Sequence, residues 1–150
     1  MVVVTQDTSK KYENTSPKKK EDPGCFSLLV IVKRFSVGKV MGDLISSATM
    51  ISLSLFNKIG GMELKSSEVR IRLDDGSLKQ AKGIIETMNI NVDGFTFSIK
   101  VVVMELKVLD RAQMILGRNF VATARAIVNV DQGEIIIRSG EDYITYQISG

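Results

Sequence analysis

The stretch GIIETMNINVDGFTFSIKVVVM, residues 83–104, predicts a long β-hairpin. Its first part, Gly83–Val92, is rich in isoleucine, valine and threonine, which favour strands. Asp93-Gly94 follows as a tight turn, because glycine tolerates the left-handed backbone that such turns need. The second part, Phe95–Met104, alternates between apolar and polar residues before it becomes continuously apolar. The hairpin indicates a chain built mainly of strands.

Similar patterns extend in both directions. Upstream, two apolar-rich runs predict another hairpin, and residues 69–73 alternate between apolar and basic side chains. Residues 52–59 are expected to form a helix, with Ser52 as its cap and Gly60 after its end, and residues 119–125 a second, shorter one. Many short strands with one or two short helices predict an all-β, closed β-barrel fold. The other strands expected are residues 26–33, 36–41, 126–130, 134–138 and 143–148.

The composition limits the possible chemistry. At 150 residues, with 44% hydrophobic and 25% charged residues, the chain is the size of one globular domain. It contains no histidine, which excludes serine–histidine triads, cysteine–histidine dyads and histidine-based zinc sites. Cys25 is the single cysteine, so no intramolecular disulfide or thiolate cluster is expected. Catalysis would have to use carboxylates, hydroxyls, lysines or backbone dipoles, and no metal or cofactor is predicted.

The net charge of +3 belongs to the N-terminal segment. Residues 1–20 carry five lysines and two acids, whereas basic and acidic residues balance in the rest of the chain. We therefore expect a disordered basic tail at residues 1–21 and a folded domain at residues 22–150. A solvated linker is the simpler interpretation of the tail, and any contact with nucleic acid would be made through it. No membrane span or targeting segment is recognisable, so a soluble protein of the cytoplasm or another intracellular compartment is expected.

Asp43 differs from the other acidic residues, most of which lie in polar turns. It follows an apolar strand and precedes Leu44, Ile45 and the hydroxyl-rich residues 46–49. A carboxylate at a strand end beside small hydroxyl residues can be held by hydrogen bonds in a reactive position. On the residues alone, an ordinary turn or cap aspartate is the simpler interpretation.

Several segments resemble the retropepsin-like aspartic protease domain of plant gypsy-type LTR retrotransposon polyproteins. The most specific is MILGRNFVATARA, residues 114–126, where the family has isoleucine-leucine-glycine-arginine-proline-phenylalanine-leucine-alanine-threonine. DPGCF at residues 22–26, GDLISS at 42–47 and LSLFNKIG at 53–60 also match. Residues 69–83 resemble the family's flap hairpin, and the resemblance extends over about residues 21–148.

This resemblance implies a barrel that supplies one catalytic aspartate, Asp43, to an active site shared by two subunits of a homodimer. The two carboxyls would share a proton and activate water for attack on a peptide bond. The substrate would be an extended polypeptide beneath a flap at residues 73–79. The other residues implied are Leu44, Ile45, Ser46, Asp74, Asp75, Gly76 and Ser77 for substrate binding, and Ser47, Leu116, Gly117 and Arg118 as support for the active-site loop.

The sequence departs from the family beside Asp43. Ile45 stands where retropepsins have glycine, Ser46 where alanine is usual, and Asn119 where the motif has proline. A β-branched side chain crowds both the backbone and the cleft. Two functions are therefore expected from the resemblance: an aspartic endopeptidase, or a catalytically inactive peptide-binding or dimerisation module derived from one.

Overall fold

The computed structural model describes residues 25–43, 46–73, 75–105, 112–129 and 131–147. The expected tail at residues 1–21, the domain boundary at residue 22 and three of the predicted site residues lie outside these ranges. Those three residues are Leu44, Ile45 and Asp74.

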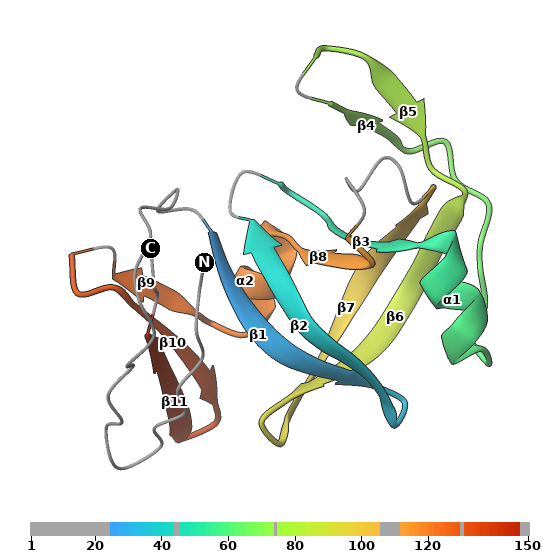
Figure 1. Cartoon of the computed structure of the whole chain (residues 1–150). Helices are drawn as coiled ribbons and strands as arrows, with labels where there is room; N and C mark the ends of the chain where they lie inside the picture. The colour runs from blue at the N-terminus through green and yellow to red at the C-terminus, as the bar shows by residue number, and fades with distance from the viewer. Residues whose placement is uncertain (1–24, 44–45, 74, 106–111, 130, 148–150) are drawn as a thin grey trace.

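Six strands form a closed barrel in the order β1-β2-β8-β3-β7-β6 (Figure 1). Most neighbouring strands are antiparallel, but β2 pairs in parallel with β8 and β3 in parallel with β7. These two parallel pairings bring together strands that are far apart in the sequence. The barrel strands are β1 (Cys25–Val32), β2 (Phe35–Asp43), β3 (Thr49–Ser52), β6 (Gly83–Val92), β7 (Phe95–Met104) and β8 (Met114–Leu116).

Two smaller sheets and two short helices complete the described fold. A hairpin of β4 (Arg70–Arg72) and β5 (Leu78–Gln80) projects beyond one end of the barrel (Figure 1). A separate sheet, in the order β11-β10-β9, lies beside the barrel. Its strands are β9 (Ile127–Asn129), β10 (Glu134–Ser139) and β11 (Asp142–Gln147), and the helices are α1 (Leu53–Ile59) and α2 (Arg118–Thr123).

The core explains why Val101–Met104 is continuously apolar. Val101 and Val103 belong to the main core inside the barrel, and neither side chain is accessible to solvent. Val102 and Met104 point to the other side of β7, where a second apolar cluster covers them. Both faces of this strand segment are therefore buried, which removes the need for polar residues in alternate positions. The second cluster consists of Met50, Ala81, Val102, Met104 and Ile115.

The C-terminal sheet is anchored to the barrel through Tyr146. This side chain is fully buried, and its hydroxyl donates a hydrogen bond to the carboxylate of Asp93 in the β6–β7 turn. Burial raises the pKa of Tyr146, and the hydrogen bond and the negative charge of Asp93 act in the same direction. The phenol therefore remains a neutral donor at ordinary pH.

The β1–β2 turn consists of Lys33 and Arg34, both of which have a left-handed backbone with φ of 49° and 71°. Hairpin turns of this kind usually contain asparagine or glycine. The Lys33 ammonium donates to the carbonyls of Gly60, at 3.4 Å, and Gly61, at 3.0 Å. The turn is thereby fastened to the segment that follows α1.

The structure confirms the closed barrel and the long hairpin, whose strands have the bounds that the sequence predicts. Helix α1 also has the expected bounds, with the Ser52 hydroxyl accepting from the amide of Leu55 at 3.0 Å. Helix α2 begins and ends earlier than expected, and the last three strands form a separate sheet outside the barrel. Strands β3 and β8 were not predicted. Among the described residues, no helix is long and apolar enough to cross a membrane.

Candidate functional site

Asp43 is the last residue of β2, and its side chain is partly buried. Its neighbour Gly42 pairs with Phe26 of β1 and with Leu116 of β8. A Cβ atom on Gly42 would lie 2.2 Å from the Phe26 ring, so glycine allows this aromatic ring to fill the core. The carboxylate is therefore carried at the end of a strand fixed on both sides.

The loop after Asp43 is bound to the start of helix α2. The amide of Ser46 donates to the carbonyl of Asp43 at 3.1 Å, which closes a tight turn. The amide of Arg118 donates to the carbonyl of Ser46 at 2.8 Å, and the amide of Asn119 to that of Ser47 at 3.3 Å. The first amides of a helix have no partner within the helix, and here the loop carbonyls satisfy them. The aspartate loop and α2 therefore form one hydrogen-bonded unit.

Gly117 permits the close approach of these two segments. A Cβ atom at this position would lie 2.3 Å from the carbonyl oxygen of Ala48 and 2.4 Å from its carbonyl carbon. Real Cβ atoms do not approach a backbone so closely, and φ of −99° at Gly117 is accessible to any residue. Glycine is thus required here for space rather than for backbone freedom.

The structure brings several of the predicted site residues together. Asp43, Ser46, Ser47, Leu116, Gly117 and Arg118 meet through backbone contacts around one loop. The Ser46 hydroxyl donates to the carbonyl of Ala48 at 2.8 Å, so it braces the loop itself. Ser47 and Arg118 are exposed.

Thr49 and Asn119 form a hydrogen-bonded bracket that sequence reasoning missed. The Thr49 hydroxyl is inaccessible to solvent; it donates to Oδ1 of Asn119 at 2.6 Å and accepts from the amide of Gly117 at 3.0 Å. The Asn119 amide group donates to the carbonyl of Lys100 in β7 at 2.8 Å. Asn119 is thus a structural link between α2, β3 and β7. The sequence signal was a threonine that directly precedes the apolar pair Met50-Ile51.

Substitution Thr49→Val is expected to lower the free energy of unfolding by about 2 kcal/mol, because it leaves the Gly117 amide and Oδ1 of Asn119 without their buried partner. The melting temperature should fall by roughly 6 °C. Thr49→Ser, which keeps the hydroxyl, is the matched control and should lose less. Equal melting temperatures for the valine and serine variants would show that the hydroxyl contributes nothing.

A row of apolar side chains crosses the outer face of the barrel beside the aspartate loop. Strand register aligns them one after another, and the partly buried Ile71 of β4 packs on the cluster in the middle of the row. At the β2 end Met41 remains 41% exposed, two residues before Asp43. The row is therefore exposed at Met41, next to the candidate carboxylate, and is buried farther along, where Ile71 of the hairpin packs on the cluster. The row consists of Met41, Ile115, Met50, Val102 and Ile84.

The β4–β5 hairpin, with its connecting turn, contains the predicted flap. The amide of Leu73 donates to the carbonyl of Ser77 at 2.8 Å, and Gly76 has a left-handed backbone with φ of 86°. The Asp75 carboxylate accepts from the hydroxyl of Ser77 at 2.6 Å and from its amide at 2.9 Å. These bonds hold the pKa of Asp75 below its usual range, with a smaller contribution from the charge of Lys79. Asp75, Gly76 and Ser77 thus shape the flap turn.

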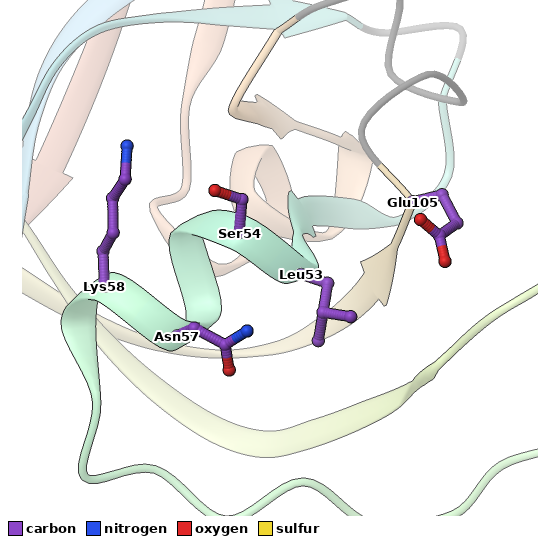
Figure 2. A pocket seen from close by; sticks show the side chains of 5 residues that line it. All are labelled: Leu53, Ser54, Asn57, Lys58 and Glu105. Carbon is purple, nitrogen blue, oxygen red and sulfur yellow. The ribbon is translucent and has the colours of Figure 1, made fainter.

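A cavity of about 520 Å³ lies elsewhere, along the exposed side of α1 (Figure 2). Ser54 and Lys58 stand one helical turn apart on α1, and Glu105 faces the helix from just beyond the end of β7. Glu105 already forms an ion pair with Lys82 at 2.8 Å. The cavity does not include Asp43. Within the described residues there is also no group of three cysteine or acidic side chains that could hold a metal ion.

The comparisons with known proteins concern the fold. The sequence matches no protein-family model and no curated protein. Many solved structures superpose on it, including the following three. The retroviral protease-like domain of Ddi1 from Leishmania major is 13% identical, with a TM-score of 0.60 over 83% of this chain and 96% of that one. The EIAV protease in complex with the inhibitor HBY-793 is 14% identical, with a TM-score of 0.54 over 75% and 92% of the two chains.

The third, a retropepsin-like aspartic protease from Rickettsia conorii, is 15% identical, with a TM-score of 0.51 over 98% of this chain and 97% of the other. The three chains are covered almost completely, so the similarity concerns whole domains. At these identities it establishes architecture and leaves catalysis to the residues of this chain. The closed six-stranded barrel with its two short helices is the retropepsin-like aspartic protease fold.

Proposed function

We propose that the chain is a retropepsin-like aspartic endopeptidase that acts as a homodimer, with Asp43 of each subunit as one half of the catalytic dyad. The observation that carries the proposal is the position of Asp43. It ends a fixed strand, on a loop hydrogen-bonded to the start of α2, and lies two residues after Met41, the exposed end of an apolar row on which the hairpin residue Ile71 packs.

The proposed chemistry needs only carboxylates and water, which suits a chain without histidine. Two carboxyl groups about 3 Å apart do not both ionise, because their charges would repel, so the dyad holds one shared proton. The ionised Asp43 acts as general base and removes a proton from water, which attacks the peptide carbonyl carbon. The protonated Asp43 of the other subunit donates its proton to the carbonyl oxygen as general acid. No covalent intermediate forms on the protein.

The substrate in this proposal is an extended peptide. Its main chain would be held by hydrogen bonds, with Leu44, Ile45 and Ser46 on one side and the flap turn at residues 74–77 on the other. The apolar row from Met41 to Ile84 contains no charged side chain, which favours apolar residues of the peptide at this surface. The folded unit is proposed to span residues 22–150, and the resemblance of residues 114–126 supports an origin in a retrotransposon polyprotein.

The experiment that tests the function is cleavage of a peptide library at pH 4–6 by the full chain, with and without pepstatin. Cleavage that pepstatin suppresses supports an aspartic mechanism. Cleavage that is unaffected by pepstatin, or that is optimal above neutral pH, contradicts it.

Dimerisation is the second requirement, because one chain provides one candidate dyad aspartate. Strand β11 is an edge strand of the C-terminal sheet, and Tyr143 on it is 46% exposed. An edge strand presents unpaired backbone groups that can bond to a second copy. Sedimentation at micromolar concentration is expected to show a dimer. A strictly monomeric chain at high concentration would leave no shared active site.

A second candidate function is an inactive peptide-binding or dimerisation module on the same barrel. The observation that favours it is Ile45, which occupies the place of the motif glycine. Such a module would bind extended peptides without cleaving them. Any binding of nucleic acid would depend on residues 1–21 and disappear when they are deleted.

A further inference from the structure

The flap presents one cation on the same side as its apolar contact. In the β4–β5 register Ile71 lies directly opposite Lys79. Residues directly opposite in an antiparallel pair project from the same face of the sheet. Ile71 packs on the cluster that contains Met50 and Val102, so this face of the hairpin is the one turned toward the apolar row. Lys79 therefore projects from the side of the flap that faces the apolar row.

The charge of Lys79 is available to a ligand. Its side chain is exposed, and no salt bridge joins it to another residue in the part of the chain that the structure describes. The charge of Lys79 also acts on the nearby Asp75 carboxylate, but the hydrogen bonds that this carboxylate accepts come from the amide and hydroxyl of Ser77. Arg70 and Arg72 lie opposite Gln80 and Leu78, on the other face of the hairpin. Among the described strand residues of the flap, Lys79 is thus the cation on the side that faces the apolar row.

The surface across from Lys79 is neutral. The row below the flap consists of methionine, isoleucine and valine, which offer no partner for an ammonium group. Beside a neutral surface of this kind, a single fixed charge discriminates between peptides by attracting side chains of one charge and repelling those of the other.

We propose that Lys79 is a specificity-determining residue that selects peptides with an acidic side chain close to an apolar one. This inference rests on the proposed function, since it assigns a substrate class to the same proposed site. The apolar residue packs against the exposed Met41 end of the row, and the carboxylate pairs with the Lys79 ammonium from the flap side.

The test measures binding separately from cleavage. Each fluorescently labelled peptide has an apolar pair at its centre. It carries Asp, Asn or Lys at one of the three positions that flank this pair on either side. Fluorescence anisotropy then gives their dissociation constants with the full chain carrying Asp43→Asn, which keeps the peptides intact. At one or more positions the Asp peptide is expected to bind about fivefold more tightly than the Asn peptide, and the Lys peptide more weakly. The preference should weaken at high salt.

Two charge variants locate the effect. Lys79→Met should remove the preference for Asp, and Lys79→Glu should reverse it in favour of Lys. Arg34→Glu makes the same change of charge in the β1–β2 turn, at the end of the barrel away from the flap (Figure 1), and should leave the preference intact. If Arg34→Glu shifts it as much as Lys79→Glu, the effect is one of net charge and the proposal fails.

The outcomes separate this inference from the proposed function. Equal affinities for the Asp, Asn and Lys peptides at all positions, a preference that survives Lys79→Met, or no peptide binding would overturn the role of Lys79, whatever the parent protein cleaves. A preference that depends on Lys79, in a chain whose Asp43 form cleaves none of these peptides, would support selection by Lys79 and contradict the peptidase.

Discussion

Substitution Asp43→Asn is expected to abolish peptide cleavage by this chain. Asparagine is nearly the same size as aspartate, but it has no ionised form and cannot act as a general base on water. In a homodimer the substitution removes both carboxyls at once, so no residual half-site remains. Loss of a general base and its acid partner should reduce kcat by at least 10⁴-fold. A full-chain assay at pH 4–6 measures this, and the melting temperature shows that the fold is intact.

Ile45 is the second half of this prediction. Removing its branched side chain by Ile45→Gly is expected to raise kcat, because a misplacement of about 1 Å near the reacting atoms can cost roughly a hundredfold in rate. The described residues on either side, Asp43 and Ser46, are joined by a hydrogen bond, so we expect the change to be local. A parent as active as Ile45→Gly would show that the loop accommodates isoleucine. Activity that survives Asp43→Asn would end the aspartic-protease proposal, and three inactive proteins would favour the binding module.

Substitution Gly117→Ala is expected to cost about 3 kcal/mol of unfolding free energy. The added Cβ meets the backbone of Ala48 at 2.3 Å, and a backbone does not yield as the end of a flexible side chain does. Either the aspartate loop moves away from α2, or α2 shifts against the barrel. Both break the bonds from Arg118 and Asn119 to the loop. Urea denaturation should show the loss of stability, together with a loss of cleavage.

Gly140→Ala is the matched control. Gly140 has φ of 63°, and a Cβ there would meet nothing within 4 Å, so alanine costs only the backbone strain of about 1 kcal/mol. It lies between β10 and β11, away from the aspartate loop, and should leave cleavage unchanged. If Gly117→Ala is no more harmful than Gly140→Ala, the loop and helix are not held in contact as described.

The fold could be predicted wherever the local pattern is strong. The hairpin of β6 and β7 has clear alternation, a glycine turn and ten residues in each strand, so its bounds follow from sequence. Strands β3 and β8 have four and three residues, all buried. Without alternation or length, they resemble short apolar segments of any kind. Their strand character comes from partners far away in the chain.

Only part of the candidate site could be predicted from the sequence. On the residues alone Asp43 was more simply an ordinary turn or cap aspartate, and it became the candidate through the family resemblance, which is most specific at residues 114–126. The bracket of Thr49 and Asn119 was not predicted, because its hydrogen bond joins residues 70 positions apart. The apolar row was also missed, because its members come from five strands and meet only through register.

The parallel pairing of β2 with β8 determines when, during synthesis and folding, the loop that follows Asp43 can be fixed in place. Asp43 is synthesised early, but the glycine and the helix amides that fix its loop follow only after β7 has been made. Contacts between such distant segments form late in folding, because closing the long intervening loop costs entropy first. A nascent chain that ends before Gly117 therefore contains Asp43 but lacks the residues that fix its loop. In the proposed endopeptidase, cleavage therefore becomes possible only after β8 and the start of α2 have been synthesised and have paired with the aspartate loop.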